Sequence, residues 1–142
     1  ELTGVQLEVG KVANDFKPES YDELLKRCER YYEKSYPNHL AVGTVTHSGM
    51  VINRFEGGSE ITNRTDMSVR FRTEKRLAPT MVVYSKQGTS GYASDFQTSD
   101  VHQANRAVNS IFHISTTGTL GLQMSSGQDD ALAYHYTAEA EL

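Results

Sequence analysis

Residues 131–138 read ALAYHYTA, and large side chains occupy every second position of this stretch, at Leu132, Tyr134 and Tyr136. Alternation with a period of two is typical of a β-strand with one buried face, because successive side chains of a strand point to opposite sides. We therefore predict a strand here, in a domain whose fold is mainly β.

The rest of the chain after Pro37 also has the composition of short strands. Six more short stretches are rich in Thr, Val, Ile and Tyr, and glycine or polar turns separate them: 41–47, 50–55, 67–72, 80–85, 109–116 and 119–125. About seven strands at this spacing indicate an antiparallel sandwich or barrel. Residues 97–108 fit either a helical turn or an edge strand, and both interpretations stay open.

Two of these stretches alternate as clearly as 131–138. In each of them three apolar residues face one side of the predicted strand: Met67, Val69 and Phe71 in the first, and Leu120, Leu122 and Met124 in the second. We expect these faces to meet in one apolar layer between the sheets.

One helix is predicted ahead of the strands. Ser20 and Glu23 form a capping box and Pro37 stops the helix, which then spans about 21–35. Its apolar residues form one stripe: Leu24, Leu25, Cys28, Tyr31 and Tyr32. The stripe packs either on the chain's own sandwich or against the same helix of partner chains, as a trimer interface. We expect Cys28 to be a small buried hydrophobe.

The chain divides at the start of this helix. Residues 3–9 alternate like a strand, and 10–19 carry the Gly, Asn, Asp and Pro of a connector. We therefore assign 1–19 as a leading strand and connector, and 20–142 as one domain made of the helix and the β-sandwich. The 142 residues are enough for one domain with a core.

Composition excludes several classes of protein. Acidic residues outnumber basic ones by 18 to 14, and the formal charge of −4 argues against general binding to nucleic acid. No apolar stretch approaches the ~20 residues of a membrane span, so we expect no membrane insertion. Cys28 is the only cysteine and cannot form an internal disulfide or a multi-cysteine zinc site.

Motifs for catalysis are missing from the sequence. It has no phosphate-binding glycine loop, no dinucleotide fingerprint and no His-Glu-x-x-His helix, and its five histidines lack the close spacing of metal ligands. We predict no enzyme activity, no catalytic residue, no metal and no cofactor. Asp95 with Asp100, or Asp129 with Asp130, could instead contribute to a glycosidase pair, which would need a carboxylate separation that sequence does not reveal.

Four segments carry a resemblance to a known family. Residues 5–21, 21–32, 67–80 and 136–142 resemble, in order and spacing, segments of bacteriophage tail fibre proteins. The helix segment, YDELLKRCERYY, is the most specific of them. The resemblance implies a homotrimeric, jelly-roll-like C-terminal tip on the virion. Such a tip recognises host cell-surface polysaccharide, capsule or lipopolysaccharide, outside the cell and without catalysis.

Residues 90–106 mix aromatic, amide, carboxylate, imidazole and guanidinium groups in a predicted loop. Aromatic rings can pack on the C–H faces of sugars while polar groups bind the hydroxyls, which makes this loop the candidate carbohydrate site. Its candidate residues are Tyr92, Asp95, Phe96, His102, Asn105 and Arg106. Alternatively, the two rings pack into the sandwich and the polar groups are ordinary surface.

Two other functions compete with glycan recognition. The domain could be a C-terminal trimerisation cap or folding aid of a fibre, whose contacts with the host are incidental. It could also be part of a capsule-degrading enzyme, although full depolymerases of this kind usually need a much longer β-helix.

Overall fold

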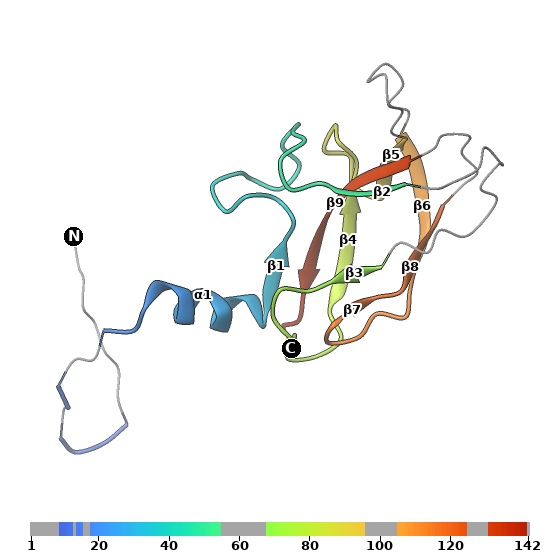
Figure 1. Ribbon diagram of the computed structural model, residues 1–142. Coiled ribbons are helices and arrows are strands. Elements are labelled where there is room, and N and C mark those ends of the chain that lie inside the picture. The colour runs from blue at the N-terminus through green and yellow to red at the C-terminus, as the bar shows by residue number, and fades with distance from the viewer. Residues whose placement is uncertain are drawn as a thin grey trace.

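The computed structural model describes residues 9–12, 14–15, 18–54, 68–95, 105–124 and 131–141. These ranges form one helix and nine strands, and all pairings between the strands are antiparallel (Figure 1). The prediction of a mainly β, antiparallel fold with one helix ahead of it is confirmed. The elements are α1 (Tyr21–Glu29), β1 (Tyr32–Lys34), β2 (Val51–Arg54), β3 (Val69–Arg70), β4 (Thr80–Tyr84), β5 (Tyr92–Asp95), β6 (Asn105–Phe112), β7 (Gly118–Thr119), β8 (Gly121–Met124) and β9 (Ala131–Glu139).

Strand β9 is the centre of the main sheet. Its C-terminal half lies between β1 and β4, which pair with Thr137 and Glu139 from opposite edges. Its N-terminal half pairs with both β2 and β5 at Leu132 and Ala133. Strand β5 continues the sheet to β6 and then β8. Four strands from distant parts of the sequence therefore depend on β9 for their pairing.

Burial of β9 differs from the prediction. The strand is where the alternation placed it, and Leu132, Tyr134 and Tyr136 are buried as expected. However, every residue from Ala131 to Ala138 is buried, not only one face. The second face is covered because Tyr36 stacks on His135, with ring centroids 3.8 Å apart, and neighbouring loops close over it.

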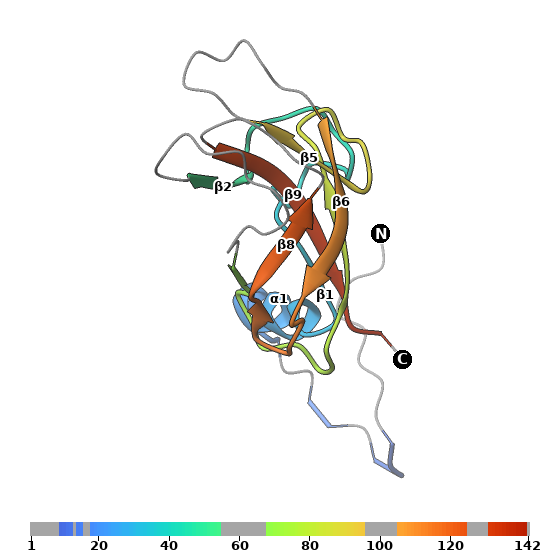
Figure 2. The ribbon, with the colours of Figure 1, turned by 90° about the vertical axis from the view of Figure 1, so that its right-hand side faces the viewer.

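The core lies between the main sheet and the small sheet of β3 and β7. Val69 and Phe71 reach it from one side, and the Phe71 ring lies 6.3 Å from the ring of Tyr136 on β9. Leu122 of β8 is 1% exposed and joins the same cluster. Figure 2 shows β6 and β8 passing in front of β9, which makes the arrangement sandwich-like. The expected burial of Val69, Phe71 and Leu122 is therefore confirmed.

The helix is shorter than predicted. Ser20 caps it as expected, since its Oγ accepts a hydrogen bond from the Glu23 N–H at 3.3 Å. The helix ends at Glu29, not near residue 35, because residues 32–34 instead pair with β9 as strand β1. Pairing with a central strand thus overrides the helical pattern. Tyr31 and Tyr32 consequently do not belong to a helical stripe.

Several other boundaries differ from the sequence prediction. Residues 41–47 form turns and not a strand, and the β6 strand ends before His113, which has a positive φ of 49°. The predicted strand at 119–125 is divided into β7 and β8, and Leu120 between them is 64% exposed instead of facing the core. Residues 92–95 of the predicted loop are strand β5.

Some predictions concern residues outside the described ranges. These include the leading strand over most of 3–9, and the side chains of Met67, Asp100, Asp129 and Asp130. For 97–108, the described part begins at Asn105, where it is strand and not helix. Because β6 pairs with both β5 and β8, it is not an edge strand.

Candidate carbohydrate-binding site

Strands β5 and β6 divide the predicted carbohydrate site between two faces of the sheet. In their register Ser94 pairs with Asn105, and Ala93 pairs with Arg106. Side chains alternate along a strand, so Tyr92 and Asn105 share one face, whereas Asp95 and Arg106 share the other. Phe96 and His102 lie outside the described residues.

Asp95 and Arg106 form a largely buried ion pair. The Arg106 Nε–H donates to Asp95 Oδ2 at 2.5 Å, and the Asp95 side chain is 1% exposed. A carboxylate this deeply buried needs such a partner, because an unpaired buried charge is strongly destabilising. The pair holds β5 against β6, and the structure does not place its carboxylate at the surface with Tyr92.

Tyr92 and Asn105 lie at the surface, but of the two only the Tyr92 ring could pack on a sugar. Tyr92 is 38% exposed. The exposed Asn105 side chain contacts the loop after β4, since its Nδ2 donates to Thr89 Oγ1 at 3.5 Å and its Oδ1 accepts from Ser94 at 3.4 Å. The structure thus places four of the predicted site residues on strands and not on a loop: Tyr92 and Asn105 on one face, Asp95 and Arg106 on the other.

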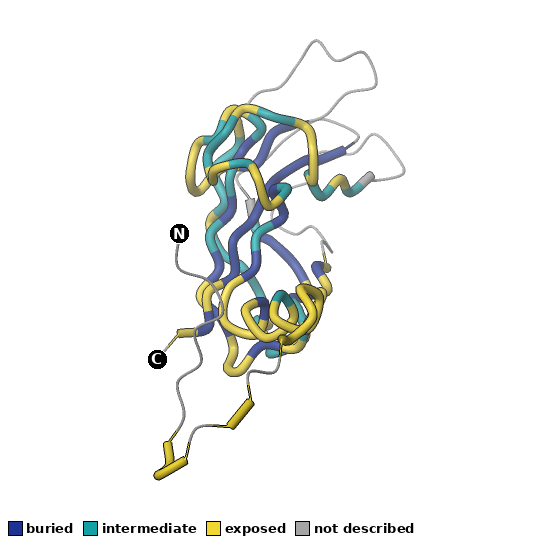
Figure 3. The backbone as a smooth tube through the Cα atoms, turned by 90° about the vertical axis from the view of Figure 1, so that its left-hand side faces the viewer, coloured by how far each residue is buried: buried dark blue, intermediate teal, exposed yellow. Residues whose placement is uncertain are grey.

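The candidate residues of the trimer interface are also separated. Helix α1 projects from the β1 edge of the sheet, and Figure 3 shows it mostly in the colour of exposed residues. Leu24 is 45% exposed and Leu25 is half-buried. Cys28 is exposed, so the prediction of a buried cysteine was wrong. The reason is that the helix turns Glu29, and not its apolar stripe, toward the sheet.

Tyr31 and Tyr32 follow the helix and lie in different surroundings. Both are 41% exposed. The Tyr31 ring faces the guanidinium of Arg76, with 5.8 Å from Cζ to the ring centroid. Tyr32 belongs to β1 and pairs with Glu139 of β9.

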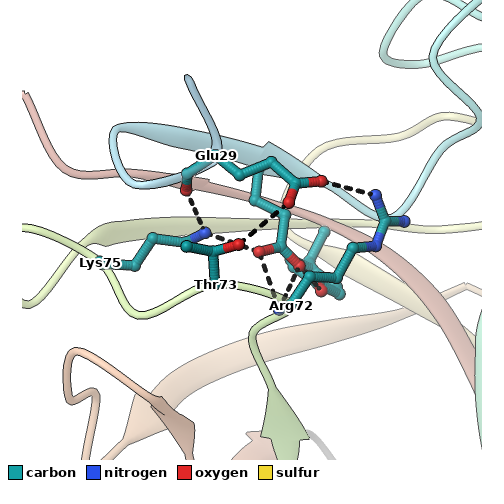
Figure 4. A network of polar contacts seen from close by, with 6 residues as sticks. Glu29, Arg72, Thr73 and Lys75 are labelled. Atoms are coloured by element: carbon teal, nitrogen blue, oxygen red, sulfur yellow. Dashed lines mark hydrogen bonds and ion pairs between the residues drawn. The ribbon is translucent and has the colours of Figure 1, made fainter. Parts of the chain in front are cut away.

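A buried polar cluster joins the end of α1, β1, β9 and the 72–75 segment (Figure 4). The Lys75 ammonium contacts Glu33 Oε2 at 2.6 Å, and both side chains are fully buried. The Tyr136 hydroxyl donates to Glu33 Oε1 at 2.7 Å, and Lys75 also donates to the Glu29 carbonyl. The burial of Tyr136 and its neighbouring Glu33 raise the pKa of its hydroxyl, which therefore stays protonated and donates. Sequence analysis missed this cluster, because Glu33 and Tyr136 lie 103 positions apart and no local pattern links them.

The outer side of Glu33–Lys75 is closed by a second carboxylate. The Glu29 side chain accepts from Thr73 Oγ1 at 3.1 Å and from Arg72 Nη1 at 3.4 Å. Arg72 is half exposed, so this outer pair is partly solvated, unlike the inner one. All the carboxylates and cations of the cluster thus have partners, which indicates a structural clamp and not a reactive centre.

His135 is a further buried titratable group to which the sequence analysis gave no role. Its Nδ1 lies 3.1 Å from Ser35 Oγ, and its Nε2 lies 3.1 Å from the Thr46 carbonyl oxygen. A carbonyl only accepts, so Nε2 carries the proton and Nδ1 accepts from the Ser35 hydroxyl. Both ring nitrogens of His135 therefore have hydrogen-bond partners. Burial lowers the pKa of His135, and the nearby His47 acts in the same direction, while the hydrogen bond to Thr46 opposes it.

This arrangement predicts a loss of stability in mild acid. The unfolded chain protonates His135 near the ordinary pKa of about 6.5, whereas the folded chain does so only at lower pH. Between these two values the unfolded state binds more protons, so the free energy of unfolding falls as the pH drops through this window. Urea unfolding at several pH values from 7.5 to 4.5 should show this fall, and His135→Gln should flatten it. The exposed His113 is the control, and an equal flattening by His113→Gln would contradict the assignment.

No group of three potential metal-ligating side chains gathers among the described residues. Within the same ranges, no helix combines the length and apolar character needed to cross a bilayer. Comparisons with protein-family models, curated proteins and solved structures each gave no match to this chain. The resemblance in sequence to tail fibres therefore stays a prediction.

Proposed function

We propose that this chain is a receptor-binding tip of a bacteriophage tail fibre, which attaches to bacterial surface glycan (capsule or lipopolysaccharide) as a homotrimer and without catalysis. The observation that carries the proposal is that exposed tyrosine rings stand on paired strands of a packed sheet, at Tyr32 and Tyr92. Rings held this way lose little conformational freedom when a sugar packs on them. The described antiparallel sheets are compatible with a jelly-roll-like tip.

The exposed helix supports association between copies. A helix of nine residues is marginal in water on its own, and most helical stability in proteins comes from packing an apolar face. Leu24 and Cys28 of α1 are exposed in the single chain. Contact with the same helices of two further chains would cover them. Three copies would also present three equal sites, and multivalency raises avidity by ~10²–10⁴ where the geometry permits.

Binding to cells tests the glycan proposal directly. The full chain is labelled and mixed with a panel of bacterial strains of defined capsule and lipopolysaccharide type, and with the purified polysaccharides. We expect retention on a subset of strains, which is lost when the corresponding polysaccharide is removed or competes. Binding that survives complete removal of surface polysaccharide would contradict the proposal, as would no retention on any strain.

The exposed helix also favours one alternative, a trimerisation cap whose contacts with the host are incidental. Light scattering separates association from glycan binding. We expect the wild-type chain to have about three times the 15.8 kDa of one copy, and Leu24→Glu to reduce it to one copy, because a buried unpaired charge disrupts an apolar interface. Leu120→Glu is the control, since Leu120 is also exposed but lies far along the chain between β7 and β8. A trimeric Leu24→Glu variant would exclude α1 as the interface, and a wild-type trimer that binds no glycan would favour the cap.

A further inference from the structure

The loop between β1 and β2 covers one side of β9 without burying a side chain of its own. We call residues 37–50 the covering loop (Figure 1). None of these residues is buried, and Val42 and Val45 are exposed. The two rings that stack at the start of the loop, those of Tyr36 and His135, are by contrast fully buried. The covering loop therefore shields part of the sheet, although the burial of apolar side chains contributes little to holding it there.

Polar and backbone contacts attach the covering loop to the rest of the domain. Lys34 Nζ donates to two carbonyl oxygens near the start of the loop. His135 Nε2 donates to the carbonyl oxygen of Thr46 at 3.1 Å. The backbone of Gly43 packs closely on that of Gly88. Two basic side chains of the sheet thus hold the loop by its carbonyl groups.

The surroundings of His135 fit a neutral imidazole. Its Nε2–H donates to Thr46, so Nδ1 accepts from the Ser35 hydroxyl. Ser35 Oγ also accepts the Tyr136 N–H at 3.0 Å, which leaves its own proton for Nδ1. Tyr36 stacks on the ring, with centroids 3.8 Å apart. A second proton on the imidazole would have to displace the Ser35 proton at a fully buried position.

A protonated His135 would also lack a counter-charge. The titratable side chains of the elements on this side of β9 are basic or phenolic: Lys34 of β1, Tyr36, His39 and His47 of the covering loop, Tyr84 of β4 and Lys86 of the 85–90 segment. Among the described residues, the nearest carboxylate along this side of β9 is Glu139, four residues away or about 13 Å. This separation exceeds the Debye length of about 8 Å at physiological salt, so Glu139 balances the charge poorly.

We propose that His135 is a pH-sensitive switch, whose protonation in mild acid detaches the covering loop from β9 while the sheet stays paired. Detachment lets water reach the imidazolium, which removes the cost of burying its charge. The sheet can stay paired because β1 and β4 bind β9 directly, and no residue from 37 to 50 belongs to a strand. The inference goes beyond the loss of global stability predicted above, since it places a first transition in one loop. It does not depend on glycan binding.

The direction of the switch follows from where the ring titrates. Burial lowers the pKa of His135 while the loop is closed, the hydrogen bond to Thr46 opposes this, and the nearby His47 lowers it further. With the loop detached, the ring titrates near its ordinary value of about 6.5. Below this pH the open form binds more protons than the closed form. The open fraction therefore rises by up to about tenfold for each pH unit, until the closed form is protonated as well.

Hydrogen exchange of backbone amides in the 142-residue chain tests the switch. Exchange is followed by NMR from pH 7.5 to 5.0 and corrected for the chemical exchange rate at each pH. The Thr44 and Met50 amides donate within the covering loop and report its opening, whereas the amides of β9 report the sheet. We expect the two loop amides to exchange at least about tenfold faster than those of β9 at every pH. They should accelerate by at least about fivefold between pH 7.5 and 5.0.

Two histidine variants assign the acceleration to one ring. His135→Gln keeps an N–H that can reach Thr46 but cannot gain a charge, so we expect the acid acceleration of the loop amides to disappear. His39→Gln is the matched control, because it removes an exposed imidazole from the same loop. It should leave the acceleration unchanged.

Each other outcome overturns the switch. Loop amides that exchange only as slowly as those of β9 would show that the loop opens by global unfolding alone. An acceleration that is absent in wild type, or that persists in His135→Gln, would show that His135 does not control the loop. If His135→Gln does not fold, the wild type still decides, because its His135 ring protons should titrate over the pH range in which the loop amides accelerate. Titration of His135 in a separate range would overturn the assignment.

Discussion

Replacing Lys75 by Met is expected to lower the free energy of unfolding by about 3–5 kcal/mol. The substitution keeps most of the apolar stem but removes the ammonium that faces Glu33, where both side chains are fully buried. The Glu33 carboxylate then keeps the Tyr136 hydroxyl and the Arg72 backbone N–H as its described partners, and neither carries a full charge. A buried carboxylate without a counter-charge is the main source of the loss. Urea unfolding monitored by circular dichroism measures it.

A surface pair and a double variant provide the controls for Lys75→Met. Arg27 and Glu19 form a pair of similar length, 2.6 Å, but their side chains are 67% and 45% exposed. Arg27→Met should therefore change stability by less than about 1 kcal/mol. Adding Glu33→Gln to Lys75→Met should restore part of the loss, because the uncompensated charge disappears. A loss of similar size in Arg27→Met and Lys75→Met would contradict the interpretation of Glu33–Lys75 as a buried clamp.

The substitution Gly88→Ala is expected to be the second strongly destabilising change, by about 2 kcal/mol or more. Gly88 has a φ of +81°, and a Cβ there would lie 2.0 Å from the carbonyl oxygen of Gly43. The 36–50 and 85–90 segments meet at this point, and they lie side by side in Figure 1. Since backbone and not a flexible side chain opposes the new atom, the two segments must separate. Thermal unfolding measures the loss.

Gly91 is a matched control, because it lies in the same loop between β4 and β5. Its φ of +78° is nearly that of Gly88, but a Cβ there meets nothing within 4 Å. Gly91→Ala should therefore show only the conformational strain, about 1 kcal/mol. The difference between the two variants isolates the contact with Gly43. Equal effects at Gly88 and Gly91 would mean that the two segments do not pack closely in solution.

Local patterns predicted the strands that bury a regular apolar face. The alternation at 131–138 places β9, and the β-branched and aromatic composition of 80–85 places β4, each within a residue or two. Val69, Phe71 and Leu122 reach the core as predicted. The helix cap at Ser20 was predicted correctly as well, because a capping box depends only on residues close together in the sequence. Each of these features depends on residues that are close together in the chain.

Features that depend on distant partners were not predictable in this way. Residues 32–34 continue a helical pattern but form β1, because β9 offers them a strand partner about 100 residues later. Asp95 resembles a surface carboxylate in sequence, and only the register of β5 with β6 shows that it shares a buried face with Arg106.

The position of β9 has a consequence for how the protein is made. A ribosome delivers the chain from its N-terminus, so β1, β2, β4 and β5 all emerge before the strand with which they pair. Until then their edges are open to pairing with neighbouring nascent chains, and the long sequence separation slows closure. We therefore expect that fast release of the finished chain from the ribosome, or a chaperone that covers the early strands, reduces their pairing with other nascent chains. A premature stop before residue 131 would leave a product prone to aggregation.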